Sequence, residues 1–469
     1  MAATALPRNI EKALASTPPS KQPSLRDIEH VVLIMLENRS FDHLFGTMSG
    51  VAGFSDPDAI KLSTGRSVFY QPTNTNSDGY LLPFHIDSRT TSGLVPGTDH
   101  SWAGEHTSWN GGKMDGWMTD GPFRAPFNMS YLDEEDIPLH RALAGAFTIC
   151  DHYHASILSS TTPNRVMWET GTIDPEGKAG GPVLTNAMNV NTWRTYAENL
   201  TDTGVSWRFY QVAGGMASQT SYWKAFREAP TTSPLYQNSQ LVPTGQFEYD
   251  AINDRLPTVS WLFPSVAQTE HPAFGIGALP ALAEQFLASA IGAVAANPDV
   301  WAKTVFIISW DENDGLFDHV PPPTAPPDTP EESTTLTSPG GIHGDGLPLG
   351  ASFRVGCIIV SPWTAGGWVC SEPFDHTSQL RFLEAVTGVE ASNISAWRRQ
   401  TFGDLTSAFR FHGKPADPPT LPDTNANLTL TQYTAAHLPA PVAPTAGHQV
   451  PPVQAPGRRP HTPRGGTGS

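Results

Sequence analysis

The 469-residue chain is poor in cysteine, in basic residues and in long apolar runs. Its three cysteines, Cys150, Cys357 and Cys370, show no C-x-x-C spacing, which argues against a disulfide framework or a zinc–thiolate site. Lys and Arg number 28 against 45 Asp and Glu, a net charge of -17, and no basic block occurs. Nucleic-acid binding and adhesion to anionic lipid by charge alone are therefore not expected. No stretch of about 18 apolar residues is present, so no transmembrane segment is predicted.

The two ends of the chain differ in composition from the middle. Residues 1–26 read as a flexible N-terminal arm, and the Pro-rich residues 414–469 are predicted to be a disordered tail because they offer too little apolar surface to bury. Residues 27–413 are predicted to form the folded domain, with a long surface loop at Pro321–Gly341. The N-terminus lacks the apolar core of a signal peptide, so the default expectation is a cytoplasmic location.

Short unbroken apolar runs alternate with helix-like segments in the middle of the chain. The runs Val31–Leu36, Thr304–Trp310 and Val355–Val360 are typical of strands buried on both faces. Helices are predicted at Leu279–Ala296 and Thr377–Val386. This alternation predicts an α/β fold: a doubly wound, mostly parallel sheet with helices on both faces.

Polar clusters follow these strands directly, where such sheets bind ligands. Glu37 and Asn38 follow the first run, and Asp311 and Glu312 follow the second. Oxygen-bearing side chains of this kind bind Ca²⁺, Mg²⁺ or Mn²⁺, and zinc also accepts them. The alternative for "DENDG" is structural, with Asp311 or Asp314 capping a helix or shaping a turn.

The segment "SSTTPNR" (159–165) places hydroxyls just before Pro163, a residue that suits the start of a helix. A helix N-terminus directs free N–H groups at an anion. Beside a metal, Thr161 would be an activated nucleophile for phosphorus, and Arg165 would brace the phosphoryl oxygens or the site itself. The alternative is an ordinary threonine cap.

Histidines supply the expected proton donor for a leaving oxygen. The candidates lie in "DHSWAGEHTSW", "TEHP", "GGIHGDG" and "FDHTS", and any one of them taken alone is more often structural; they are His100, His106, His271, His343 and His376.

Taken together, five motifs resemble the bacterial phosphoesterase family: "EHVVLIMLENRSFDHLFG", "STTPNR", "SWDENDGLFDHVPPP", "FRVGCIIVSPW" and "FDHTSQLRFLE". This family includes non-specific phospholipases C and acid phosphatases and belongs to the alkaline phosphatase-like superfamily. The segment "TDHSWAGEHTSWNGGKMDGW" resembles the phospholipase C branch in particular. The resemblance makes residues 27–413 the expected phosphoesterase catalytic domain.

The resemblance implies one divalent metal ion, of a kind that the sequence does not identify, and a set of site residues. Its metal ligands would be Glu37, Asn38, Thr161, Asp311 and Glu312, with Thr161 also the nucleophile. Around the phosphate it implies His106, His271 and Arg165. More weakly, it implies His343, at the position of a metal-site histidine, and His376. Relatives are often secreted, which the cytoplasmic default does not match.

The resemblance implies a phospholipase C-type hydrolase that cleaves phosphodiesters such as phosphatidylcholine through a phosphothreonine, acting on a small-molecule or phospholipid substrate. The alternatives are an acid phosphatase acting on monoesters and a non-catalytic relative. The branch usually has Gly-Pro where this chain has Ser159-Ser160. Of the aromatics Trp102, Trp109 and Trp117, two are expected in the core and the third could face a choline head group.

Overall fold

The computed structural model describes residues 10, 12–13, 23–119, 125–187, 189–216, 218–272, 275, 279–411 and 420–463. A seven-stranded sheet forms its centre, in the order β11-β6-β10-β9-β1-β8-β7. The strands are β1 (His30–Leu36), β6 (Thr148–Cys150), β7 (Trp207–Tyr210), β8 (Val259–Leu262), β9 (Thr304–Trp310), β10 (Cys357–Val360) and β11 (Val369–Cys370). Only β10 runs antiparallel to its neighbours, so the predicted mostly parallel sheet is confirmed.

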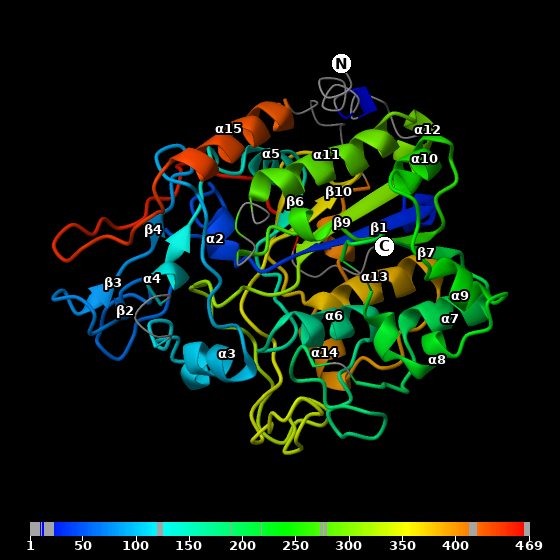
Figure 1. Ribbon diagram of the computed structural model, residues 1–469, viewed down its shortest axis with the longest axis horizontal. Coiled ribbons are helices and arrows are strands. Elements are labelled where there is room, and N and C mark those ends of the chain that lie inside the picture. The colour runs from blue at the N-terminus through cyan, green and yellow to red at the C-terminus, as the bar shows by residue number, and fades with distance from the viewer. Residues whose placement is uncertain are drawn as a thin grey trace.

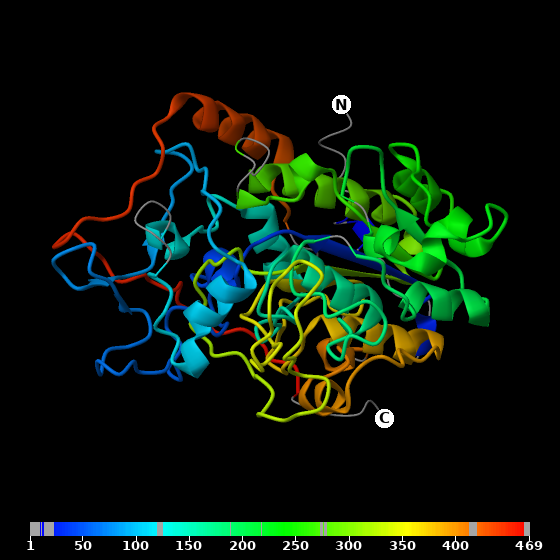
Figure 2. The ribbon, with the colours of Figure 1, turned by 60° about the horizontal axis from the view of Figure 1, so that its bottom comes forward.

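Helices cover both faces of this sheet, as predicted. On one side lie α5 (Pro138–Ala146), α10 (Gln246–Ile252), α11 (Pro280–Ala295), α12 (Pro298–Trp301) and α15 (Thr424–His437). On the other lie α6 (Thr161–Thr170), α13 (His376–Thr387) and α14 (Ala396–Thr401). Figure 2 shows the sheet between these two layers. The predicted helices at Leu279–Ala296 and Thr377–Val386 correspond to α11 and α13.

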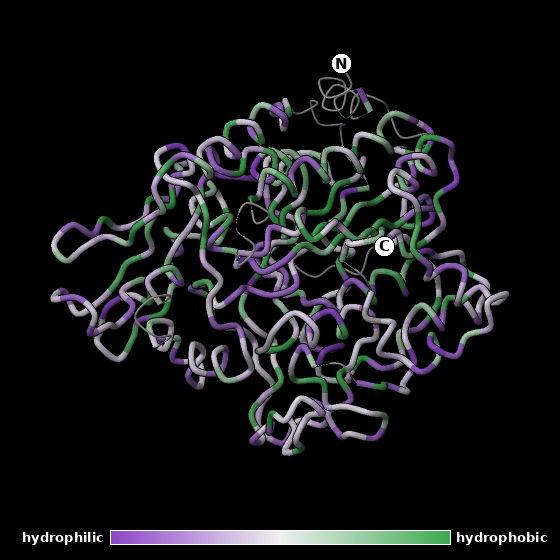
Figure 3. Tube along the Cα trace, viewed as in Figure 1, coloured by the Kyte–Doolittle hydropathy of each residue, from purple (hydrophilic) through white to green (hydrophobic). Residues whose placement is uncertain are grey.

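The central strands are apolar along their whole length because both of their faces are covered. Every residue of β1 and β9 is buried, and the hydrophobic colour in Figure 3 gathers along these strands. Burying a large aliphatic side chain contributes roughly 1.5–3 kcal/mol. This continuous burial fixes the two strands side by side and therefore fixes where each one ends.

The remaining elements are short. Around the edge strand β7 lie α7 (Tyr196–Thr203), α8 (Lys224–Arg227) and α9 (Pro234–Asn238). The segment that follows β1 contains α2 (Phe41–Phe45), β2 (Gln71–Pro72), β3 (Tyr80–Leu81), β4 (Phe84–His85), α3 (Trp102–Trp109), α4 (Ala125–Asn128) and β5 (Ser130–Tyr131). It lies on the side of the sheet toward which the carboxyl end of β1 points (Figure 1). This segment is placed to cover the polar residues at that end.

The C-terminal residues 420–463 are ordered, which corrects the prediction of a disordered tail. Asp423 caps α15, and Asn427 of α15 donates to Glu284 of α11 at 3.0 Å. Further on, the Arg459 side chain donates to the Gly367 carbonyl at 3.0 Å. Polar anchoring to the folded domain supplies the order that composition alone did not predict. The predicted N-terminal arm falls mostly on residues 1–9, 11 and 14–22, outside the described residues.

None of the helices within the described ranges is long and apolar enough to cross a bilayer.

Candidate active site

The carboxyl ends of β1 and β9 bring the two predicted acidic pairs together. The strands pair in parallel from His30–Thr304 to Leu36–Trp310, so Glu37 and Asp311 leave the sheet next to each other. The Asn38 backbone N–H donates to Asp311 Oδ1 at 3.1 Å. All four predicted polar residues here are buried.

Arg165 of α6 links the two strand ends. Its guanidinium donates to Glu37 Oε1 at 3.2 Å and to Asp311 Oδ2 at 3.3 Å, and its side chain is completely buried. Arg165 therefore pairs with two of the predicted metal ligands, and its role toward a phosphoryl group stays a prediction. Thr161 precedes Arg165 by four residues on the same helix and therefore lies on the same helix face.

Thr161 is the first residue of α6, which begins two residues before Pro163. The turn before it is held by Asn164, whose Oδ1 accepts from the N–H groups of Ser156 and Ile157, each at 2.9 Å. The Asn164 amide also donates to the Ser160 carbonyl at 3.1 Å. Thr161 stays partly exposed, so it stands at an accessible helix N-terminus.

Two histidines and a third carboxylate join this cluster. Ligand atoms of His100, His271 and Asp314 lie within 4.8 Å of one another. His100 Nδ1 is 3.3 Å from Asp314 Oδ1 and its Nε2 is 3.7 Å from Glu312 Oε1. The Asn38 amide contacts His271 Nε2 at 3.0 Å and donates to Asp314 Oδ1 at 2.9 Å.

The cluster concentrates buried negative charge. Burial raises the pKa of Glu37 to about 7, against the opposing charge of Arg165. Burial also raises the pKa of Glu312 well above its usual range, and the neighbouring Asp311, Asp314 and Glu105 raise it further. Carboxylates removed from water in this way are normally paired or bound to a metal.

Two buried oxygens in the cluster have no hydrogen-bond donor: Asn38 Oδ1 and Glu312 Oε1. A buried acceptor without a donor is costly, and a cation satisfies it directly. Amide and carboxylate oxygens beside two imidazoles form a donor set that hard divalent cations and zinc both accept. The residues present therefore fit a divalent metal ion. Asn38, Glu312 and Asp314 would bind it, along with the adjacent carboxylates of Glu37 and Asp311.

His100, rather than His106, is the histidine of the 98–109 segment that reaches the acidic cluster. His106 is bonded through Nδ1 to the Trp102 carbonyl at 2.7 Å and through Nε2 to the Pro348 carbonyl at 3.0 Å. It lies inside α3, whose winding turns it toward these backbone groups, whereas His100 precedes the helix. This corrects the placement of His106 at the phosphate.

The two weaker histidine candidates differ in position. His343 lies in an exposed loop, 2.6 Å from Asp345, which corrects its placement at the metal site. His376 is fully buried behind the cluster, with Nε2 2.7 Å from the Asp311 carbonyl and Nδ1 3.0 Å from the Tyr153 hydroxyl. It is placed to support Asp311 from behind.

Sequence reasoning named His100 among the candidate histidines but preferred His106, and it did not select Asp314 or Glu105 as site residues. Asp314 has a left-handed backbone with φ of 56°, which turns its side chain back toward Asn38. Spacing along the chain does not reveal such a turn, although Asp314 stands in the same "DENDG" motif as Asp311. Trp102 and Trp117 are buried and Trp109 is partly buried, as expected for core aromatics.

An acidic, histidine-containing cluster at the carboxyl ends of parallel strands is the site position typical of α/β enzymes. The sequence pattern of the Phosphoesterase family matches residues 28–390. The chain belongs to the Phosphoesterase family.

Two relatives show where the similarity lies. A non-hemolytic phospholipase C of Pseudomonas aeruginosa is 41% identical over 447 residues, covering 91% of this chain and 63% of the relative. Phospholipase C A of Mycobacterium tuberculosis is 41% identical, covering 90% of this chain and 83% of the relative. The similarity thus covers less than two thirds of the first relative's length and most of the second's.

Proposed function

We propose that this chain is a metal-dependent phosphoric ester hydrolase of phospholipase C type that acts through a phosphothreonine at Thr161. The observation that carries the proposal is the position of Thr161: it starts α6 on the helix face that bears Arg165, and Arg165 is bonded to Glu37 and Asp311. This position supports a hydroxyl nucleophile at the start of α6, one helical turn before the arginine that pairs with the acidic cluster.

The chain's own residues then supply the steps. Thr161 Oγ1 forms a bond to phosphorus while the ester bond to the departing alcohol breaks. His271, which faces the Asn38 amide at 3.0 Å, gives its proton to the leaving oxygen. Burial and the neighbouring His100 and Arg39 lower the pKa of His271 to about 4. A phosphate anion that binds nearby would raise this pKa, because it stabilises the protonated imidazole. Water then attacks phosphorus and gives a proton to His271 while the bond to Thr161 Oγ1 breaks. The proton that the Thr161 hydroxyl released to solvent in the first step returns to Oγ1.

A bound divalent cation would supply Lewis-acid polarisation of a phosphoryl oxygen and would favour ionisation of the Thr161 hydroxyl. The positive end of the α6 dipole, at Thr161, would add stabilisation of the phosphoryl oxygens.

The proposed substrate is a phosphodiester such as phosphatidylcholine. Both relatives described above are named phospholipase C, and their similarity extends over nine tenths of this chain. Diacylglycerol would be the leaving alcohol, and the phosphorylated head group would remain on Thr161 until water releases it.

A substrate panel with purified protein tests this proposal. We expect turnover of p-nitrophenyl phosphorylcholine and phosphatidylcholine to exceed that of p-nitrophenyl phosphate, and EDTA to abolish it reversibly. Preference for the monoester would instead indicate an acid phosphatase. Metal analysis of the same preparation identifies the ion.

Thr161→Ala tests the nucleophile, with Thr162→Ala as a matched control. Thr162 is the neighbouring threonine in the same helix turn, but it is buried and its N–H is bonded to Asn186 at 2.8 Å. We expect Thr161→Ala to lose activity by at least about 10³-fold, as when a nucleophile is removed, while Thr162→Ala retains it. A phosphorylated peptide containing Thr161 after acid quenching would support the intermediate, and full activity of Thr161→Ala would overturn it.

A further inference from the structure

A chain of buried polar groups lies beneath the loop that carries His271. His140 of α5 contacts two carboxylates, with Nε2 3.1 Å from Glu270 Oε1 and Nδ1 3.2 Å from Glu284 Oε1. All three side chains are fully buried. Although burial lowers the pKa of His140, the two carboxylates raise it to about 10, so the histidine is charged at neutral pH.

Glu270 is held at both its side chain and its backbone. Its Oε1 also accepts a hydrogen bond from Trp310 Nε1 at 2.7 Å, and its carbonyl accepts two from the Arg39 guanidinium at 3.1 and 2.7 Å. Its backbone is left-handed, with φ of 64°, a conformation that a glutamate keeps only when its surroundings impose it.

The residues on either side of Glu270 touch the candidate site. The Thr269 carbonyl accepts from the Glu37 N–H at 2.9 Å. The His271 ring lies 3.0 Å from the Asn38 amide. A change in the orientation of Glu270 would therefore be transmitted to both sides of the acidic cluster.

The two carboxylates depend on the His140 ring to different degrees. Glu284 also accepts from the Leu139 and His140 backbone N–H groups at 2.7 and 3.1 Å, and from Asn427 at 3.0 Å. Glu270 has Trp310 on Oε1 and no hydrogen-bond partner on Oε2. Removing the imidazole therefore leaves Glu284 with three donors and loosens the Glu270 side chain, which keeps the bond from Trp310.

We propose that His140 is a positioning residue, which ties Glu270 to Glu284 and so holds the loop Thr269–His271 with His271 against Asn38. The inference rests on the proposed function, because the bridge matters for the reaction only if His271 is the proton donor. His140 itself lies behind the loop and does not contact the proposed nucleophile.

A double-mutant cycle separates positioning from a merely structural role. We expect His140→Leu to lower kcat by about 10–100-fold, the usual effect of removing a residue that orients a site group. KM should change less than kcat. In a His271→Ala background, His140→Leu should cause little further loss, because both changes act through one side chain. His140→Gln, which keeps two N–H donors, should recover part of the activity.

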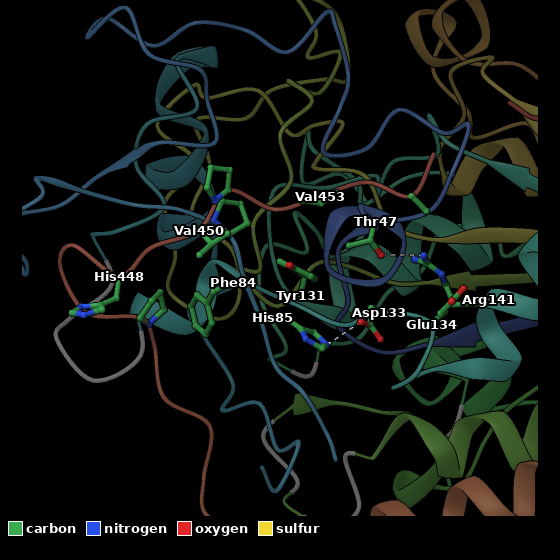
Figure 4. Close-up of a pocket in the computed structure, with 14 residues that line it drawn as sticks. Thr47, Phe84, His85, Tyr131, Asp133, Glu134, Arg141, His448, Val450 and Val453 are labelled. Atoms are coloured by element: carbon green, nitrogen blue, oxygen red, sulfur yellow. Dashed lines mark hydrogen bonds and ion pairs between the residues drawn. The ribbon is translucent and has the colours of Figure 1, made fainter. Parts of the chain in front are cut away.

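Amide hydrogen exchange provides a readout that does not require activity. The peptide containing 269–271 should exchange faster in His140→Leu than in the wild type. The control is His85→Gln: His85 also lies between two carboxylates, 2.7 Å from Asp136 and 3.4 Å from Asp133. It lines a separate cavity of about 520 Å³ under the C-terminal segment (Figure 4). We expect it to change neither kcat nor exchange at 269–271.

Additive losses in the double mutant, unchanged exchange at 269–271, or an equal effect of His85→Gln would each overturn the proposal. If His140→Leu does not fold, the same measurements are made on His140→Gln. A His140→Gln protein with wild-type kcat and wild-type exchange at 269–271 would overturn the proposal. If the wild type hydrolyses no phosphoester, the proposed function fails, whereas the exchange comparison still tests whether His140 holds the loop.

Discussion

Replacing Arg165 by methionine should destabilise the metal-free protein far more than the metal-bound one. The guanidinium is fully buried and is the donor that bridges Glu37 and Asp311, at 3.2 and 3.3 Å. Breaking a buried ion pair costs about 3–5 kcal/mol, because the partner is left as an uncompensated buried charge. Here the substitution removes the guanidinium from two carboxylates, so about 3–5 kcal/mol is the expected loss of stability for the protein without metal.

A divalent cation supplies the compensation that Arg165→Met removes. Binding at 100-fold above its Kd stabilises a folded protein by about 2.7 kcal/mol. The variant should gain more than the wild type, since its cluster holds one positive charge fewer. Arg165→Met should therefore melt several degrees below the wild type in EDTA, and the difference should shrink when metal is restored.

The assay is thermal melting of both proteins in EDTA and with added Mg²⁺, Ca²⁺, Mn²⁺ or Zn²⁺. Arg399→Met is the control: Arg399 pairs with Glu384 at 2.7 Å near the surface, with its side chain 32% exposed. A surface pair is worth roughly 0–1 kcal/mol, and this one should be insensitive to metal. An Arg165→Met deficit that is the same with and without every metal would refute the reasoning.

Three further outcomes are expected. Gly315→Ala should lower activity, because its φ is 68° and an added Cβ would meet the Asp99 carbonyl oxygen at 2.5 Å, displacing the segment that carries His100; kcat and metal affinity check this. Although burial lowers the pKa of His319, Asp42 and Asp56 raise it to about 9, above the unfolded value of 6.5. Its contribution to stability, on the order of 3 kcal/mol, is full below about pH 6.5 and is lost as pH rises through about 9; melting from pH 6 to 9.5 should show a fall that His319→Gln lacks. Removing the metal with EDTA should lower the melting temperature of the wild type, and an unchanged temperature would count against a cation at the acidic cluster.

Much of the fold was predictable from the sequence because the strands are buried on both faces. Val31–Leu36 and Thr304–Trp310 are continuous apolar runs, and each ends where a polar pair begins. The order of the strands and the antiparallel direction of β10 were not predictable, since both depend on how distant segments pack. The ordered C-terminal segment was also missed, because its stability comes from contacts with α11 and other parts of the folded domain.

The candidate site divides in the same way. Glu37, Asn38, Asp311 and Glu312 were identifiable because each directly follows a strand, and Thr161 with Arg165 because they share one short motif. The choice between His100 and His106 depends on where α3 begins, because His100 precedes the helix and His106 lies inside it. The composition of "DHSWAGEHTSW" does not reveal that helix start.

By itself, the sequence determined three of the seven strands of the central sheet and the polar residues at the ends of two of them, since local apolar patterning controls both. Only the tertiary structure decided that Arg165 neutralises two carboxylates from different strands, that His100 and Asp314 complete the cluster, and that His140 supports the loop of His271. These contacts join residues more than 100 positions apart, and pairings over such separations are set by packing rather than by any local pattern.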